Sequence, residues 1–116
     1  MLIIYGIKNC STMKKAFTAL EQKNLPYQFH DYKKQGIGAE KLQYWLTLVD
    51  ANLLLNKKGT TWRKLDDEQQ AYALANPQQL IETLIAHPSM IKRPVLEHAK
   101  GLLVGFDDIA YQQLSQ

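Results

Sequence analysis

The first thirty residues switch between the hydrophobic periods of strands and helices, and this limits the fold more than any other feature of the chain. Residues 2–5 form a short apolar run that ends at Gly6, as expected for a buried strand. Apolar residues then recur at the helical spacing i, i+3, i+4 and i+7, namely Met13, Ala16, Phe17 and Leu20. Residues 27–30 alternate as a second strand does. This succession predicts two parallel strands joined by a right-handed helical crossover.

Glycines at positions 36 and 38 mark a change of architecture. Residues 39–88 contain helical patterns and no strand signal. One of the predicted helices starts at Pro77, because proline is accepted in the first turn. Its predicted buried face consists of Leu80, Ile81, Leu84 and Ile85.

Strand patterns return at residues 94–98 and 102–104, separated by a Lys100-Gly101 turn, and they predict a hairpin. A final helix follows, with acidic residues at its start and Ile109, Ala110 and Leu114 expected to pack inward. The order is therefore β-α-β, a helical insert, then β-β-α. We predict an α/β protein with a thioredoxin-like fold and a mixed four-stranded sheet. It would be a single domain over residues 1–116, with the helical insert at about 39–88.

Composition excludes several classes of protein. The chain has 14 Lys and Arg against 11 Asp and Glu, and the basic residues are scattered, so we do not expect nucleic-acid binding. A single cysteine excludes an internal disulfide and a multi-cysteine metal site, and it is typical of a reducing compartment. The apolar run near the N-terminus is too short for a signal peptide or a membrane span. We expect a cytoplasmic protein with no metal, no bound cofactor and no membrane association.

The single cysteine, Cys10, lies between the first predicted strand and the first predicted helix. Unpaired N–H groups and the positive end of the helix dipole favour a thiolate there. The alternative is a small, inert, buried side chain, but the polar neighbours Asn9, Ser11 and Thr12 favour a reactive thiol. Position 13, where a CxxC motif has its second thiol, is methionine. Any redox cycle would therefore need an external thiol.

The chain has only two arginines, and both are candidates for binding an anion, since a guanidinium can bind a carboxylate or oxyanion through two hydrogen bonds. Arg63 follows a loop-like stretch, residues 59–62, and by itself would be read as an ordinary surface residue. Arg93 directly precedes Pro94 at the entrance to the third predicted strand, where the proline restricts the local geometry. Arg93 is therefore the stronger candidate on local sequence alone.

Three segments, residues 5–16, 56–65 and 91–95, resemble the ArsC family, most closely its short YffB branch. The resemblance covers nearly the whole chain. It implies a thioredoxin-like fold with an inserted helical subdomain, in a family that includes arsenate reductases linked to glutathione and glutaredoxin, and the Spx transcriptional regulators. Cys10 matches the catalytic cysteine of the reductases. Arg63 and Arg93 match the first two of three oxyanion-binding arginines, and Pro94 matches a proline expected to be cis.

The chain departs from the arsenate reductases at the third arginine. That position reads Val104-Gly105-Phe106, and no arginine follows Arg93. The resemblance therefore implies a glutathione-dependent thiol reductase better than it implies an arsenate reductase. Glutathione would be a co-substrate, or a small redox protein such as glutaredoxin would be the partner, and the substrate would be a small-molecule or protein thiol. An Spx-like regulator that binds RNA polymerase is the alternative, although Met13 removes the CxxC switch of many Spx proteins.

The predicted site thus has Cys10 as its nucleophile. The residues predicted to bind substrate or glutathione are Arg63, Arg93, Ser11, Thr12 and Pro94. Backbone N–H groups around Ser11 and Thr12 would stabilise developing negative charge.

Overall fold

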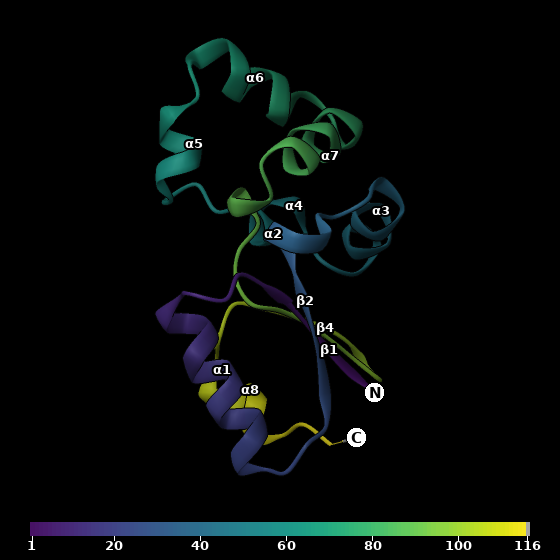
Figure 1. Ribbon diagram of the computed structural model, residues 1–116. Helices are drawn as coiled ribbons and strands as arrows, with labels where there is room; N and C mark the ends of the chain where they lie inside the picture. The colour runs from purple at the N-terminus through teal and green to yellow at the C-terminus, as the bar shows by residue number, and fades with distance from the viewer. Residues whose placement is uncertain (116) are drawn as a thin grey trace. The chain divides into compact units, whose positions relative to one another are not determined.

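Four strands form a mixed sheet in the order β2-β1-β3-β4 (Figure 1). β1 (Leu2–Gly6) pairs in parallel with β2 (Tyr27–Asp31) and antiparallel with β3 (Val95–His98), which forms a hairpin with β4 (Gly101–Val104). The computed structural model describes residues 1–115. The mixed four-stranded sheet and the thioredoxin-like order of elements predicted from the sequence are confirmed.

Two helices, α1 (Ser11–Gln22) and α8 (Asp108–Gln112), cover one face of this sheet (Figure 1). Side chains alternate across a strand, so Leu2 and Ile4 point toward these helices from β1. The helical spacing noted in the sequence places the apolar side of α1 against them. The buried core of this layer consists of Leu2, Ile4, Met13, Ala16, Ala19, Leu20, Leu96, Tyr111 and Leu114.

The register of the strands determines which loops meet at one edge of the sheet. Gly6, the last residue of β1, lies beside Asp31, the last residue of β2. Tyr5 lies beside Val95, the first residue of β3. The loop after β1, the short helix α2 (Tyr32–Gln35) after β2, and the segment that enters β3 therefore share this edge.

The chain divides into two compact units. The sheet unit comprises Met1–Gln35 and the chain from Arg93 onward, and the helical unit comprises Gly36–Lys92. The insert expected at about 39–88 falls within the second of these. The sheet unit is thus assembled from two segments that are far apart in the sequence.

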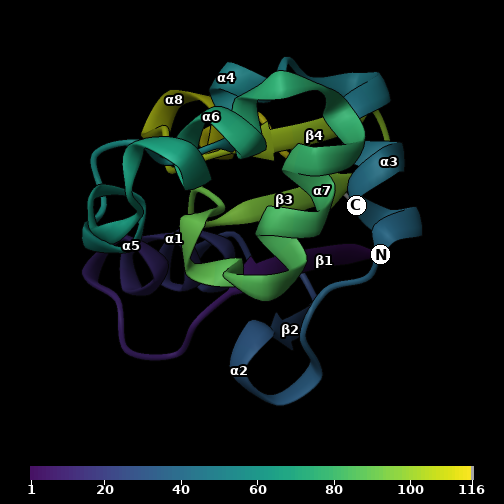
Figure 2. The same cartoon turned by 90° about the horizontal axis from the view of Figure 1, so that it is seen from above.

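The helical unit contains α3 (Ala39–Leu48), α4 (Ala51–Leu54), α5 (Thr60–Lys64), α6 (Asp67–Ala75), α7 (Pro77–Ala86) and the 3₁₀ turn η1 (Pro88–Met90). Both tryptophans, Trp45 and Trp62, are buried. α6 and α7 lie side by side and are separated only by Asn76 (Figures 1 and 2). Asp66 and Gln69 form a capping box that starts α6.

Some local expectations were wrong. Arg63 does not follow a loop, because residues 60–64 form the short helix α5. Ile85 is 40% exposed and Ile109 is 70% exposed, although both were expected to be buried. α8 has only five residues, and it uses Tyr111, followed by Leu114 just beyond its end, to cover the sheet. A helix this short buries only one narrow side.

Within residues 1–115, no helix is long and apolar enough to cross a membrane.

Candidate active site

Cys10 is the residue that precedes the first turn of α1, at the edge of the sheet where the loop after β1 ends. Its backbone is extended, with φ −143° and ψ 129°, as is usual at the N-cap of a helix. The thiol is free and half-buried, and it packs against the hydrophobic core of the sheet unit. The sulfur is thus held by the core on one side and open to a reactant on the other.

The surroundings of Cys10 favour its thiolate. Partial burial by itself raises the pKa of the thiol, but hydrogen bonds from the Met13 N–H, the Arg93 guanidinium and the Thr12 N–H outweigh it, and the charge of Arg93 adds to them. The net effect lowers the pKa of Cys10 below its ordinary value. No conventional side-chain hydrogen bond caps α1 at this position. The two N–H groups therefore matter mainly as stabilisers of the anion.

Arg93 is brought to the sulfur by the strand that follows it. The Arg93–Pro94 peptide bond is cis, as the family resemblance implied. Pro94 is buried, and its carbonyl accepts a hydrogen bond of 2.7 Å from the N–H of Gly105 at the end of β4. The start of β3 is therefore held on one side by its pairing with β1 and on the other by this hydrogen bond from the end of β4. The guanidinium is half-buried beside a sulfur from the opposite end of the chain.

Ser11 and Thr12 form the first turn of α1. Ser11 is exposed and Thr12 is half-buried. The N–H of Thr12 acts on Cys10, as predicted for this turn, whereas the second N–H that does so belongs to Met13, not Ser11. From the sequence, Met13 was expected on the apolar side of the helix and in the place of a second thiol, but not as a donor to Cys10.

Arg63 belongs to the helical unit, where it lies in the last turn of α5. Its side chain is exposed, and its Nε donates a long hydrogen bond of 3.5 Å to the carbonyl of Gly59. Next to it, the hydroxyls of Thr61 and Ser89 are 2.8 Å apart. Arg63 is thus presented to solvent by its own unit, and its action on a substrate held at Cys10 stays a prediction.

Sequence reasoning missed a buried tyrosine beside this site. Tyr32 directly follows β2 and is 4% exposed. Burial is the main cause that raises the pKa of its phenol, while the nearby Arg93 guanidinium acts in the opposite direction. The hydroxyl has no hydrogen-bond partner within the described chain. The predicted parallel pairing of β1 with β2 was a usable signal, because it brings the residue after β2 to the edge that carries Cys10.

Tyr5 forms a polar contact that was also not expected from the sequence. Its hydroxyl donates a hydrogen bond of 2.7 Å to Oε1 of Glu97, across from β1 to β3. Burial, followed by this contact, raises the pKa of Tyr5 above its ordinary range. The ring of Tyr5 also lies 4.8 Å from that of His30 on β2. These residues join β2, β1 and β3 on the face opposite α1.

Gly6 provides the space that Met13 needs. A Cβ at position 6 would lie 2.4 Å from the Sδ of Met13 and 2.6 Å from its Cε. Met13 itself is fully buried. The close approach of these two residues sets the first turn of α1, and hence the N–H groups near Cys10, against the end of β1.

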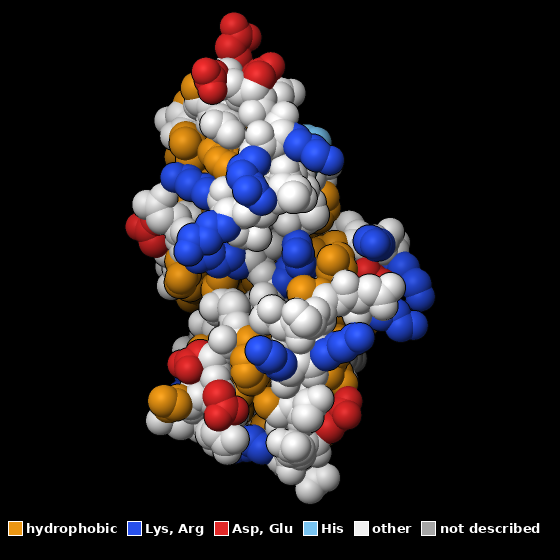
Figure 3. All heavy atoms as spheres, turned by 90° about the vertical axis from the view of Figure 1, so that its left-hand side faces the viewer, with side chains coloured by type: hydrophobic (Ala, Val, Ile, Leu, Met, Phe, Trp, Pro, Cys, Tyr) orange, Lys and Arg blue, Asp and Glu red, His pale blue; other side chains and the backbone are white. Residues whose placement is uncertain are grey.

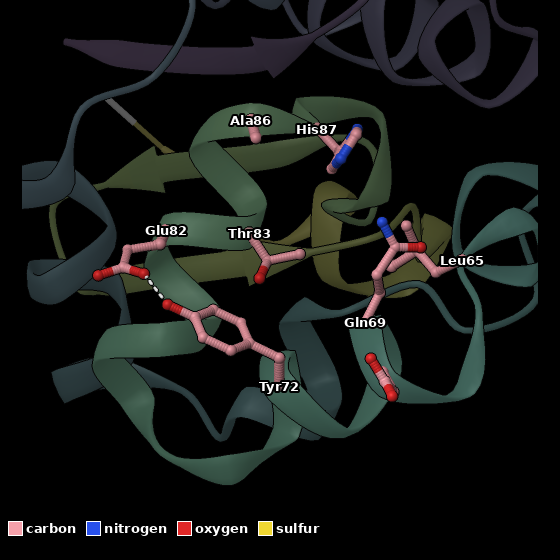
Figure 4. Close-up of a pocket in the computed structure, with 8 residues that line it drawn as sticks. Leu65, Gln69, Tyr72, Glu82, Thr83, Ala86 and His87 are labelled. Carbon is pink, nitrogen blue, oxygen red and sulfur yellow. Dashed lines mark hydrogen bonds between the residues drawn. The ribbon is translucent and has the colours of Figure 1, made fainter.

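The helical unit has a groove of its own, of about 430 Å³, between α6 and α7 (Figure 4). Tyr72 and Glu82 are hydrogen-bonded across it, and Glu68, Thr83 and His87 are among its other lining residues. It contains neither the cysteine nor an arginine. Among residues 1–115, no three His, Cys, Asp or Glu side chains are grouped so that they could hold a metal ion.

The chain is similar to known proteins over nearly its whole length. Residues 5–114 match the ArsC family. The solved structure of a YFFB protein is 47% identical, with a TM-score of 0.91 over 97% of this chain and 96% of the other. An arsenate reductase (ArsC) related protein from Brucella melitensis is 46% identical, with a TM-score of 0.74 over 97% and 95%. An uncharacterized protein of Haemophilus influenzae is 36% identical over 97% of this chain and 96% of its own length.

A more distant group of relatives has a different role. The global transcriptional regulator Spx of Listeria innocua is 23% identical over 93% of this chain and 82% of its own length. The matching proteins therefore include both reductase-related proteins and regulators.

Proposed function

Because the chain belongs to the ArsC family, we propose that it is a glutathione-linked thiol oxidoreductase with Cys10 as its nucleophile. The observation that carries this proposal is the environment of the sulfur. Two helix N–H groups and the Arg93 guanidinium lower the pKa of the only thiol in the chain. Such an environment is typical of reactive cysteines and is not needed by an inert one.

The proposed reaction has two thiol–disulfide exchanges. The Cys10 thiolate attacks the glutathione sulfur of a mixed disulfide between glutathione and a substrate thiol. A Cys10–glutathione disulfide forms, and the substrate leaves as a thiolate. A second glutathione thiolate then attacks the bound glutathione sulfur, which releases Cys10 as a thiolate and gives oxidised glutathione. The second step needs an external thiol, because position 13 is methionine and the chain has no resolving cysteine.

The same geometry disfavours arsenate as the substrate. Arg93 is the only arginine that the sheet unit contributes, and no arginine follows it in the sequence. The turn after β4 has Gly105 and Phe106 in its place, followed by two aspartates. A doubly charged oxyanion would therefore lose one of its charge-assisted hydrogen-bond donors. Arg63 is the second anion-binding side chain in our proposal, as the family pattern implies.

The test is to mix the reduced protein with oxidised glutathione and measure its intact mass. We expect one glutathionyl group on wild-type protein, its removal by reduced glutathione, and no adduct on Cys10→Ser. A purified glutaredoxin should be tried as the alternative reductant. Normal turnover of a glutathione mixed disulfide by Cys10→Ser would disprove the mechanism. Since the cycle consumes reduced glutathione, a cytoplasmic location is part of the proposal.

An Spx-like regulatory role is the second candidate, and the similarity to Spx proteins supports it. It makes a different prediction for the same protein. A regulator of this kind would be recovered with RNA polymerase from a cell extract, and the recovery would not depend on glutathione. A Cys10 thiol that fails to react with glutathione disulfide, together with polymerase binding, would favour this role over the reductase.

A further inference from the structure

A hollow of about 370 Å³ lies in the sheet unit between α1 and the start of α8, and we name it the α1 hollow. It is a shallow hollow that is open to solvent and is lined by both polar and apolar side chains. Figure 3 shows the face of the sheet unit that carries α1, where basic and acidic side chains lie beside exposed hydrophobic surface. The side chains that line the hollow include Lys14, Lys15, Thr18, Gln22, Phe106 and Asp108.

The α1 hollow begins close to the proposed nucleophile. Lys14 is one helical turn from Cys10, and its N–H donates a hydrogen bond of 3.0 Å to the Cys10 carbonyl. One turn of helix advances only about 5.4 Å. Cys10 and Phe106 also pack against the same hydrophobic core. A group joined to the Cys10 sulfur therefore starts about one helical turn from the lysines that line the hollow.

The charged side chains of the α1 hollow are available to a ligand. Lys14, Lys15 and Asp108 are all exposed. Within residues 1–115, neither lysine ammonium nor the Asp108 carboxylate takes part in a hydrogen bond or ion pair. The hollow thus offers two positive charges and one negative charge. At neutral pH glutathione carries the opposite set, which is two carboxylates and one ammonium.

We propose that the α1 hollow is the subsite that holds the glutathionyl group of the Cys10 mixed disulfide; this rests on the glutathione-linked function proposed above. Lys14 and Lys15 bind the two carboxylates, and Asp108 binds the ammonium of the γ-glutamyl group. The ring of Phe106 covers the apolar middle of the tripeptide. The site therefore selects a zwitterionic peptide thiol.

This assignment gives the loop after β4 a positive role in specificity. Where the resemblance implies a third arginine in the arsenate reductases, this chain reads Val104-Gly105-Phe106, and Asp108 follows at the start of α8. The carboxylate of Asp108 repels an inorganic dianion but attracts an ammonium group. The segment from Phe106 to the start of α8 therefore both disfavours arsenate and recognises glutathione.

The test compares the rates at which two disulfides react with Cys10 in matched variants. Oxidised glutathione carries the charges that the hollow should recognise, whereas bis(2-hydroxyethyl) disulfide carries none. Lys14→Gln/Lys15→Gln should slow glutathionylation of Cys10 about 3- to 10-fold, since each exposed ion pair contributes a few-fold at most. Its rate with the neutral disulfide should not change. Lys34→Gln/Lys100→Gln removes the same charge from exposed residues of the sheet unit that do not line the hollow, and should leave both rates unchanged.

Asp108→Asn tests the other half of the site. It should slow the reaction with oxidised glutathione but not with its N-acetylated form, which has no ammonium. Circular dichroism on every variant confirms that the fold is retained.

Three results would overturn the assignment. If Lys14→Gln/Lys15→Gln slows the reactions of Cys10 with both disulfides equally, the substitutions act on the thiol itself. Equal slowing of glutathionylation by both double variants would show a general effect of net charge. If wild-type protein reacts with the neutral disulfide but not with oxidised glutathione, the glutathione-linked function itself is wrong, and the subsite with it.

Discussion

Adding one methyl group at Gly6 should disturb both the core and the reactivity of Cys10. An alanine Cβ there would lie 2.4 Å from the Sδ of Met13 and 2.6 Å from its Cε, far inside ordinary contact distances. Met13 is fully buried, so its side chain cannot swing into solvent. The methionine side chain must repack within a packed core, and we expect the first turn of α1, which carries the Met13 N–H that stabilises the thiolate, to move with it.

The size of the effect follows from two opposing contributions. Overpacking a core typically costs about 1–3 kcal/mol. A glycine-to-alanine change also stabilises the fold by about 0.4–1 kcal/mol, because it restricts the unfolded chain. We therefore expect Gly6→Ala to destabilise the protein by about 1–2 kcal/mol, and a domain of this size loses roughly 3–6 °C of melting temperature per kcal/mol.

A double-mutant cycle with Met13→Ala isolates the clash. Met13→Ala alone should cost about 2–5 kcal/mol, because it leaves a cavity. In Gly6→Ala/Met13→Ala the added methyl meets no methionine, so the double variant should be more stable than the sum of the single effects predicts. Urea unfolding gives the stabilities, and alkylation by iodoacetamide as a function of pH gives the thiol pKa, which should rise in Gly6→Ala. A neutral Gly6→Ala, or strictly additive effects, would refute the reasoning.

Three further predictions concern the thiol and the helical unit. Arg93→Gln removes a hydrogen bond and a positive charge from the sulfur, so the thiol pKa should rise; an unchanged alkylation profile against pH would contradict this contact. The folded-state pKa of Cys10 is lowered, so its thiolate stabilises the fold at high pH, and this contribution is lost as the pH falls through the folded-state pKa. The difference in urea stability between wild-type and Cys10→Ser should therefore grow from about pH 6 to pH 9.5, the range that spans ordinary thiol titration. Asp66→Ala should cost about 0.5–2 kcal/mol by removing the cap of α6, and an equal cost for Asp67→Ala, which leaves the cap intact, would argue against a capping effect.

The architecture could be predicted from the sequence wherever a hydrophobic pattern typical of a strand or a helix extended over enough residues to be recognised. The helical spacing of apolar residues in α1 and the continuous apolar run at residues 2–5 were both clear. The predicted sheet and its covering helix are confirmed. α5 has only five residues, too few for a period, and its glycine N-cap resembles a loop. The exposure of Ile109 depends on which side of a short helix meets the sheet, and tertiary packing decides that.

The candidate site was predictable in its location but not in its interactions. The change from strand to helix placed Cys10 at a helix start, whereas Arg93 was assigned to the same site by the family resemblance and not by the strand pattern. The role of the Met13 N–H depends on the backbone angles of a single N-cap residue, which no sequence pattern reveals. Tyr32 was missed because one aromatic residue after a strand has no distinctive spacing.

The division of the sheet unit between the two ends of the chain affects when the thiol becomes reactive. Arg93 approaches Cys10 only after β3 has paired with β1, a contact between residues some ninety positions apart. Contacts of such long range form late in folding, because the intervening chain must first close a large loop. On the ribosome, the cysteine emerges long before its arginine. The nascent chain therefore carries a thiol without the Arg93 contact, and the full lowering of its pKa comes with completion of the sheet.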